Sequence, residues 1–179
     1  MLGSESGAVS FLIPPIVHLA QIEIDEANRL LEAWSHKMGA CRRPNSHIWA
    51  HAMFMHGEPV AVSITASLVR ETCAGLTRAE AVELARLCAG RPRLNRAMLR
   101  IWREAVLPPL CRAYGWTWAV SYQDEDIHSG NTYRFDGWKV LGRSSSGTDK
   151  RSGRKGRRKT VWGWRIPEGE PCFAARAET

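Results

Sequence analysis

The stretch Ser121–Trp138, with the sequence SYQDEDIHSGNTYRFDGW, carries the strongest local signal for the fold of this chain. Its start overlaps a short apolar run, Trp116–Tyr122, which predicts a β-strand. An acidic turn follows, then a short helix predicted over Ile127–Phe135 that carries Tyr133, and then a Gly-Trp pair that opens another strand. The stretch therefore predicts a strand, a turn, a helix and a strand in immediate succession.

Segments on either side of this stretch alternate between strand and helix patterns. Ile16–Ala20 predicts a first strand, and a helix capped by Asp25 and ended by Gly39 follows it. The remaining predicted elements are strands at His47–Met55 and Val60–Val69, a loop at Arg70–Arg78, a strand at Ala81–Cys88, a helix at Asn95–Val106 that Pro108-Pro109 should bend or interrupt, and strands at Trp138–Arg143 and Thr160–Ile166.

The resulting order, β-α-β-β-β-α-β-α-β-β, predicts an α/β (α+β) fold with a mixed, twisted sheet of about six to seven strands and helices on both faces. With 179 residues the chain fits a single domain. We expect that domain over residues 16–166, with an N-terminal extension at 1–15, a basic loop at 144–159 and a tail at 167–179.

The net charge of +7 is concentrated in one segment. Seven basic residues fall within ten positions: Lys150, Arg151, Arg154, Lys155, Arg157, Arg158 and Lys159. Removing these seven from the 25 basic residues leaves 18, equal to the 18 acidic residues. A neutral body with one basic segment indicates a polyanionic partner, most often nucleic acid. The alternative is a solvated loop that only aids solubility.

Several classes of protein do not fit the sequence. No apolar run reaches the roughly 18 residues that a membrane span needs, and the N-terminus has neither a basic start nor an uninterrupted apolar run, so we expect no cleaved signal. Five scattered cysteines without a C-x-x-C pair predict reduced thiols and a cytoplasmic setting. The histidines lack tight ligand spacing, so we expect no metal.

The order of elements across residues 16–166, with Tyr133 on the helix after a strand and Gly137-Trp138 beyond it, resembles the GNAT superfamily of N-acyltransferases. The resemblance is closest to the phage and prophage branch, the Mom-like DNA-modification proteins. It implies acetyl-CoA or another acyl-CoA as donor, and a base amine of nucleic acid as acceptor, with DNA favoured over RNA. The chain departs from the family's Gly-rich Q/R-x-x-G-x-G/A loop, because only Gly90 is present there.

The resemblance places the acyl-CoA diphosphate at the start of the helix Asn95–Val106. Unpaired backbone N–H groups and the helix dipole favour negative charge at that position, and three nearby arginines add donors for phosphate. The candidate cofactor-binding residues are Leu87, Cys88, Ala89, Arg91, Arg93, Asn95, Arg96 and Ser129. The alternative is an ordinary strand-turn-helix unit with a basic N-terminus.

Four residues are candidates for catalysis. The resemblance implies that Tyr133 protonates the leaving thiolate; the alternative is a core tyrosine bonded to a backbone carbonyl. Asp124, at the end of a strand, accepts the amine proton or orients the acceptor; the alternative is that Asp124 or Asp126 caps the following helix. Glu83, in an apolar strand, must be functional or paired, with Arg86 as a possible partner. His36 matches a histidine motif on the acceptor side of the phage relatives.

Strict alternation along Ala81–Cys88 predicts Val82, Leu84 and Arg86 on one face of the strand, with Glu83, Ala85 and Leu87 on the other. Two other functions stay open at this point. One is a GNAT acetyltransferase that acts on a protein, a tRNA or a small amine. The other is a catalytically inactive GNAT-fold protein that binds nucleic acid.

Overall fold

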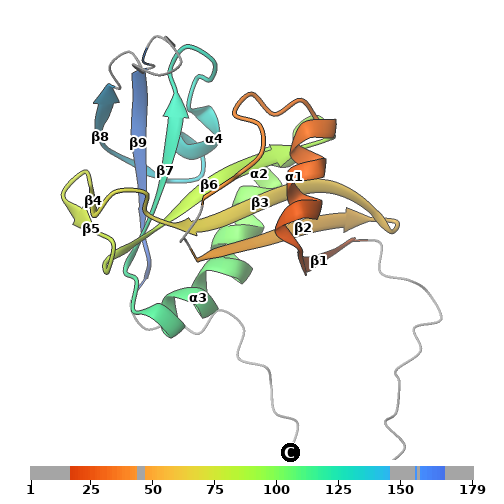
Figure 1. Cartoon of the computed structure of the whole chain (residues 1–179), viewed down its shortest axis with the longest axis horizontal. Coiled ribbons are helices and arrows are strands. Elements are labelled where there is room, and N and C mark those ends of the chain that lie inside the picture. Colours follow the sequence, from red (N-terminus) through yellow and green to blue (C-terminus); the bar gives the residue numbers. More distant parts are fainter. Residues whose placement is uncertain (1–16, 44–46, 146–155, 157, 168–179) are drawn as a thin grey trace, which may run out of the picture.

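Seven strands form one mixed sheet in the order β1-β2-β3-β6-β7-β9-β8 (Figure 1). The computed structural model describes residues 17–43, 47–145, 156 and 158–167. The strands are β1 (Val17–Ile22), β2 (Ile48–Met55), β3 (Glu58–Ser67), β6 (Ala81–Ala89), β7 (Trp118–Asp124), β8 (Lys139–Ser145) and β9 (Arg158–Arg165). A separate small hairpin, β4 (Thr72–Cys73) with β5 (Leu76–Thr77), lies in the predicted loop Arg70–Arg78.

Helices cover both faces of the sheet, as predicted. They are α1 (Ile24–Ala33), α2 (Leu94–Ile101), a π-helical turn (Trp102–Val106), α3 (Leu107–Tyr114) and the short α4 (Asn131–Arg134). Side chains of α1 pack with β2 and β3 on one face, whereas those of α2 and α3 pack on the other. The π turn precedes Pro108-Pro109, so the predicted interruption takes the form of a widened turn in a continuing helical run.

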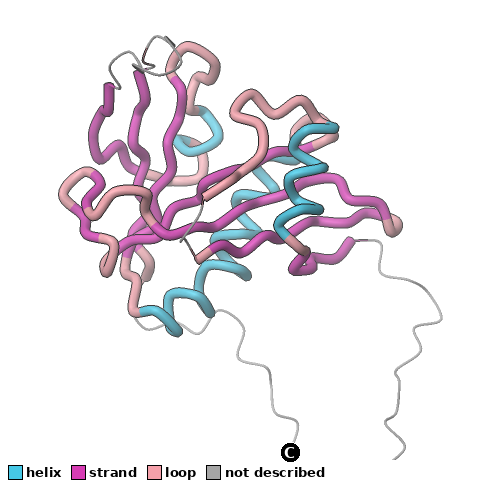
Figure 2. The backbone as a smooth tube through the Cα atoms, in the orientation of Figure 1, coloured by secondary structure: helices cyan, strands magenta, loops and turns pink. Residues whose placement is uncertain are grey.

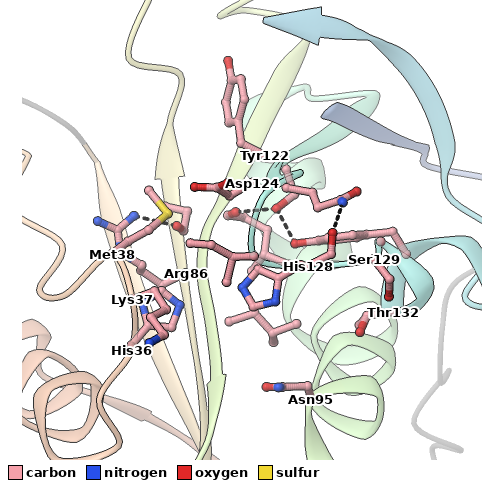
Figure 3. Close-up of a pocket in the computed structure, with 18 of the residues that line it drawn as sticks. His36, Lys37, Met38, Arg86, Asn95, Tyr122, Asp124, His128, Ser129 and Thr132 are labelled. Carbon is pink, nitrogen blue, oxygen red and sulfur yellow. Dashed lines mark hydrogen bonds between the residues drawn. The ribbon is translucent and has the colours of Figure 1, made fainter. Parts of the chain in front are cut away.

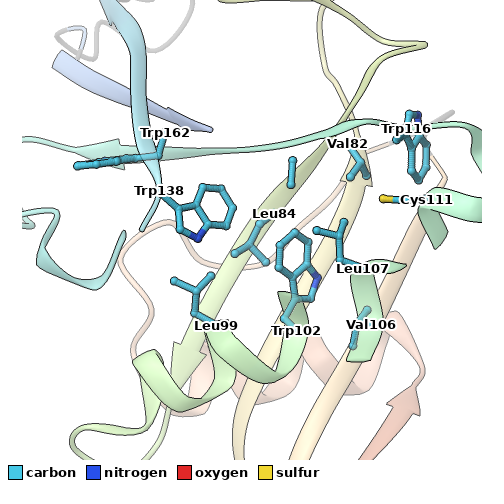
Figure 4. Packing of buried hydrophobic residues seen from close by; sticks show 11 residues of the cluster. Val82, Leu84, Leu99, Trp102, Val106, Leu107, Cys111, Trp116, Trp138 and Trp162 are labelled. Carbon is cyan, nitrogen blue, oxygen red and sulfur yellow. The ribbon is translucent and has the colours of Figure 1, made fainter. Parts of the chain in front are cut away.

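The core beneath α2 and α3 is rich in tryptophan (Figure 4). Trp102 is completely buried, and its indole Nε1 donates a hydrogen bond to Thr65 Oγ1 at 2.7 Å. Leu84 of β6 and Leu99 of α2 pack in the same cluster. This core fixes α2 against the sheet and so sets where its N-terminus lies relative to the end of β6.

The two parallel strands at the centre of the sheet separate soon after they meet. β6 and β7 pair only over Ala81–Glu83 and Trp118–Val120. Beyond this point they diverge, β7 rising with β9 and β8 while β6 continues beside β3 (Figure 1). β6 also carries a bulge, because Thr65 pairs with Leu84 while its neighbour Ile64 pairs with Arg86.

The bulge overturns the predicted alternation along β6. It adds one residue at Ala85, so the side chains beyond it exchange faces. Leu87 packs with the α2 and α3 cluster, whereas Cys88 packs with the α1 cluster. The guanidinium of Arg86 lies on the α1 side and donates to the carbonyl oxygens of Gly39 and Ala40, so its predicted place beside Leu84 is wrong.

Two predicted helices are shorter in the structure. The first ends at Ala33, well before Gly39, because Ser35 adopts a left-handed conformation with φ 53° and the chain turns away. Its N-cap is Glu23, not Asp25. The helix predicted over Ile127–Phe135 is only the short turn of α4, preceded by loop (Figure 2).

Candidate functional site

A cavity of about 160 Å³ opens where β6 and β7 separate (Figure 3). The segment after α1, the bulged part of β6, the end of β7, the turn that follows it and α4 all contribute side chains. The residues that line it are His36, Lys37, Met38, Leu84, Ala85, Arg86, Leu87, Asn95, Ser121, Tyr122, Gln123, Asp124, Ile127, His128, Ser129, Gly130, Asn131, Thr132 and Tyr133. Since the strands part here, a ligand can reach backbone groups that strand pairing would otherwise cover.

Tyr133 is held in this cavity by a chain of hydrogen bonds across the gap between the strands. The Ser121 hydroxyl donates to the carbonyl oxygen of Leu84 at 3.0 Å. Its oxygen lies 2.8 Å from the Tyr133 hydroxyl, which therefore donates to it. The Tyr133 ring stacks on Trp162, with centroids 5.7 Å apart, and meets Trp138 edge-on at 5.4 Å. The phenol is therefore fixed in position and orientation.

The surroundings of Tyr133 favour its neutral form. Burial raises the pKa of the phenol, and the negative charge of Glu83 raises it further, while the Ser121 hydroxyl offsets part of this effect. Tyr133 thus keeps its proton at neutral and mildly alkaline pH. A protonated hydroxyl in a cavity can act as a general acid.

His36 lines the same cavity. Burial, with the charges of Arg86 and His128, lowers the pKa of His36 to about 4. Its imidazole is therefore neutral at pH 7. Its Nδ1 is buried and has no hydrogen-bond partner among the described residues. A neutral imidazole has one ring nitrogen that can accept a hydrogen bond and one that can donate.

Asp124 ends β7 and is 5% exposed. Its Oδ1 accepts a hydrogen bond from the backbone N–H of Asp126 at 3.1 Å, which shapes the turn after the strand. The N-cap of α4 is Gly130, so the alternative in which Asp124 or Asp126 caps a helix over Ile127–Phe135 is wrong. The carboxylate lines the cavity beside Tyr122.

Glu83 has a structural partner that the sequence did not indicate. Arg43 donates two hydrogen bonds to its carboxylate, at 2.9 and 2.6 Å. The Glu83 side chain is 5% exposed and that of Arg43 15%. The expected partner, Arg86, bonds to backbone carbonyls instead. Glu83 lies outside the lining of the cavity at the strand gap and lines a neighbouring one.

The N-terminus of α2 provides the other end of the site. Arg93 precedes the helix with φ 69°, a left-handed conformation that non-glycine residues rarely adopt. The first N–H groups of the helix, from Leu94 onward, have no partner within the helix itself. Arg96 donates to the carbonyl oxygen of Phe135 at 3.0 Å and so ties α2 to the end of α4.

The predicted site residues separate into groups. His36, Leu87, Asn95, Asp124, Ser129 and Tyr133 line the cavity at the strand gap. Ala89, Arg91, Arg93 and Arg96 lie at the junction of β6 and α2, whereas Cys88 is buried against α1.

Two residues of the site, Ser121 and Arg43, were not predicted from the sequence. A serine inside the apolar run Trp116–Tyr122 was the one available signal for the first; the partner of Glu83 left no local signal.

Most of the basic segment, namely Lys150, Arg151, Arg154, Lys155 and Arg157, lies outside the described residues. Its last two members begin β9. Arg158 Nη2 lies 3.6 Å from Asp126 Oδ1, and Lys159 Nζ lies 6.0 Å from the centre of the Tyr122 ring.

The described residues also bear on metal binding and on membrane insertion. In the part of the chain that the structure describes, no cluster of three or more His, Cys, Asp or Glu side chains is arranged to hold a metal ion. None of the described helices has the length and apolar character needed to cross a membrane.

No protein-family model matches the chain, and no curated protein matches it in sequence. Solved structures do match its fold. The ribosomal-protein-S18-alanine N-acetyltransferase of Escherichia coli superposes with a TM-score of 0.57 at 12% identity, over 86% of this chain and 96% of its own. The yncA protein of Salmonella typhimurium, solved with its cofactor acetyl-CoA, gives 0.58 at 11% identity, over 89% and 99%.

The aminoglycoside 6'-N-acetyltransferase of Enterococcus faecium gives a TM-score of 0.53 at 12% identity, over 86% of this chain and 99% of its own. These similarities cover 86–89% of this chain. The chain therefore has the GNAT fold, a mixed sheet that includes the parallel β6–β7 pair.

Proposed function

We propose that this protein is an acyl-CoA-dependent N-acyltransferase whose acceptor is a base amine of nucleic acid, with DNA as the favoured polymer. The observation that carries the proposal is the buried Tyr133 hydroxyl, fixed by Ser121 in a cavity at the gap between β6 and β7. The structures superposed above include three acetyltransferases by name or cofactor, which supports the donor.

The residues present fit an acyl-CoA. The N-terminus of α2 offers unpaired backbone N–H groups to a diphosphate, and Arg91, Arg93 and Arg96 add positive charge close to it. The backbone of β6 beyond its bulge faces the gap where β7 has left it. This stretch suits the extended pantetheine arm, which carries amide groups that pair with a free strand edge.

Acyl-CoA supplies the acyl group as a thioester, so the acceptor amine forms a C–N bond while the C–S bond breaks. Tyr133 gives its proton to the departing sulfur and takes one back from solvent afterwards. The amine must lose a proton as it is acylated. Asp124 and the neutral His36 both line the cavity and are the candidate acceptors of that proton.

The nucleic-acid acceptor rests on the charge distribution. All of the excess positive charge falls in the segment from Lys150 to Lys159, which joins β8 and β9 in sequence. Phosphate contacts from such a segment bind nucleic acid without reading its sequence and raise the local concentration of acceptor. A protein, tRNA or small amine acceptor is the competing possibility.

The loop before α2 favours one second candidate, a catalytically inactive protein that binds nucleic acid. Pro92 lacks an N–H group, and Arg93 takes the left-handed conformation that a glycine adopts without strain. Both features depart from the Gly-rich loop of the family. Failure of the protein to bind acetyl-CoA would favour this candidate.

Mass spectrometry of nucleosides tests the proposal. DNA and RNA are isolated from cells that express the protein or its Tyr133→Phe variant, which keeps the ring packing on Trp162. We expect a new acylated nucleoside that is lost or strongly reduced in the variant. A nucleoside pool identical to that of cells without the protein, in both DNA and RNA and with an active acetyl-CoA supply, would contradict the nucleic-acid acceptor.

A further inference from the structure

A second and larger cavity, of about 380 Å³, lies beside the first. It is bounded by the start of β6, the β4–β5 hairpin and the paired strands β8 and β9. Met38, Ala85 and Tyr122 line both cavities, which makes them neighbours. The volume falls within the range of small-molecule sites, about 300–1,000 Å³.

The lining of this second cavity is strongly positive. Among the described residues, four cations line it, Arg43, Arg70, Arg143 and Lys159, against a single carboxylate, Glu83. Arg43 and Glu83 neutralise one another through their two hydrogen bonds. Three cations therefore remain around the opening, and we call Arg70, Arg143 and Lys159 the rim cations.

The rim cations are only weakly engaged with other protein groups. Arg143 is 82% exposed, and its Nε lies 3.4 Å from Glu125 Oε1, a carboxylate that also accepts from Thr160 Oγ1. Lys159 approaches the ring of Tyr122. Three positive charges around one concavity repel one another, and a cavity focuses their field. This arrangement is favourable when an anion occupies the site.

Unlike the rim, the inner wall of the cavity carries no net positive charge. Glu83 is buried there, and the Tyr122 hydroxyl donates a hydrogen bond to Cys73 Sγ at 2.9 Å. Burial raises the pKa of both the Tyr122 phenol and the Cys73 thiol, so both stay neutral at pH 7. A ligand that fits this cavity is therefore anionic at the rim and uncharged further in.

We propose that the second cavity is the acceptor subsite and that the rim cations hold a phosphate group of a nucleotide in a DNA chain. The uncharged base then lies along Tyr122, toward the cavity that contains Tyr133. This inference rests on the proposed function, whose acceptor it places. Its new content is the phosphate-binding role of Arg70, Arg143 and Lys159, two of which lie outside the basic segment.

The test compares two triple variants of the full chain. The rim variant carries Arg70→Gln, Arg143→Gln and Lys159→Gln. The control variant carries Arg29→Gln, Arg112→Gln and Lys139→Gln, three exposed cations that line neither cavity. Both variants lose three positive charges, so a general loss of electrostatic attraction to DNA lowers the affinity of both equally. The probe is a fluorescein-labelled single-stranded DNA 12-mer, titrated by anisotropy at several salt concentrations, with dAMP as competitor.

We expect the rim variant to bind the 12-mer at least tenfold more weakly than the control variant. The plot of log affinity against log salt has a negative slope. The magnitude of this slope should also decrease, by about 0.7 for each phosphate of single-stranded DNA that a rim cation no longer neutralises. dAMP should compete with the 12-mer on the wild type, whereas deoxyadenosine should compete less because it lacks the phosphate. Equal affinities of the two triple variants would overturn the inference.

Acetyl-CoA, itself a phosphate carrier, is titrated into the same proteins. We expect acetyl-CoA to bind the wild type and the rim variant equally and not to displace the 12-mer. Displacement, or loss of acetyl-CoA binding in the rim variant, would assign the cavity to the donor and overturn the inference. Absence of acetyl-CoA binding to the wild type would instead overturn the proposed function, whatever the DNA result.

Discussion

At the scale of single residues, the site is defined by two neutral groups that line the cavity, the Tyr133 phenol and the His36 imidazole. Burial is the first cause of both pKa shifts, upward for the phenol and downward for the imidazole. Each group is therefore uncharged at pH 7. Tyr133 has a proton to donate, and His36 has a nitrogen that can accept one.

Replacing Tyr133 with phenylalanine should lower kcat for acyl transfer by roughly 10²–10⁴-fold, the usual range for loss of a general acid. The ring contacts with Trp138 and Trp162 remain and only the hydrogen bond to Ser121 is lost, so the melting temperature should fall slightly and the affinity for acetyl-CoA should not change. Steady-state kinetics, thermal melting and calorimetry check the three quantities. An unchanged kcat would assign Tyr133 to the core alone.

The stability of the protein should fall as the pH decreases below about 6.5. His36 has a folded-state pKa of about 4 against an ordinary value of 6.5, and burial lowers the pKa of His51 as well. Between these values the unfolded chain binds more protons than the folded one, so acid favours unfolding. Urea unfolding at pH 7 and pH 5 should show this loss.

His36→Gln is the matched variant for that measurement. It removes one of the two depressed pKa values, so its stability should fall less than that of the wild type over the same pH interval. A loss of equal size in both proteins would contradict the assignment to His36.

The buried pair Arg43–Glu83 is the second residue-scale feature. Glu83→Gln leaves the Arg43 guanidinium without its carboxylate in a largely buried place, which should cost about 3–5 kcal/mol in free energy of unfolding. The double variant Arg43→Met/Glu83→Leu removes both charges and should recover most of that loss. Urea denaturation of the three proteins measures this, and a Glu83→Gln variant as stable as the wild type would show that the pair contributes little.

At the scale of elements, the junction between β6 and α2 depends on contact with the end of α1. The residue at this junction is Gly90, and a Cβ atom there would lie 2.4 Å from Trp34 Nε1. The indole therefore packs directly on the backbone at the start of the proposed diphosphate loop. Trp34 is the C-cap residue of α1, directly before the left-handed Ser35 at which the chain turns away.

Gly90→Ala should destabilise the protein by about 1–3 kcal/mol, because the added methyl group must displace the Trp34 indole. The loop should shift with it, so acetyl-CoA should bind more weakly. The double variant Gly90→Ala/Trp34→Leu restores space for the methyl group, so its loss of stability should be smaller than the sum of the losses in the two single variants. Additive losses in denaturation would contradict the direct contact.

At the scale of the whole molecule, the order of strands and helices was predictable from hydrophobic patterns, and the GNAT fold followed from that order together with Tyr133. The details that shape the site were not. Beyond the bulge at Ala85, the side chains of β6 lie on the opposite faces from those predicted. No local sequence pattern indicates an extra residue in a strand. The pairing of Glu83 with Arg43 joins residues 40 positions apart, which is a tertiary contact without a sequence spacing.

The sequence did indicate residues that meet at the strand gap. His36, Asp124 and Tyr133 line one cavity although they come from three separate segments. Ser121 left only a weak signal, a serine within an apolar run, because a small polar residue in a strand is ordinary until its neighbours are known. Its hydroxyl bonds to both Leu84 and Tyr133, and it does so because β6 and β7 have already separated.

Isothermal titration of acetyl-CoA into the wild-type protein tests whether this chain depends on an acyl-CoA donor. We expect one acetyl-CoA site per chain, and weaker binding by an Asn95→Asp variant, which places negative charge at the start of α2 where the diphosphate would lie. No heat of binding at millimolar acetyl-CoA, from a protein that melts cooperatively, would contradict an acyl-CoA-dependent function for this fold.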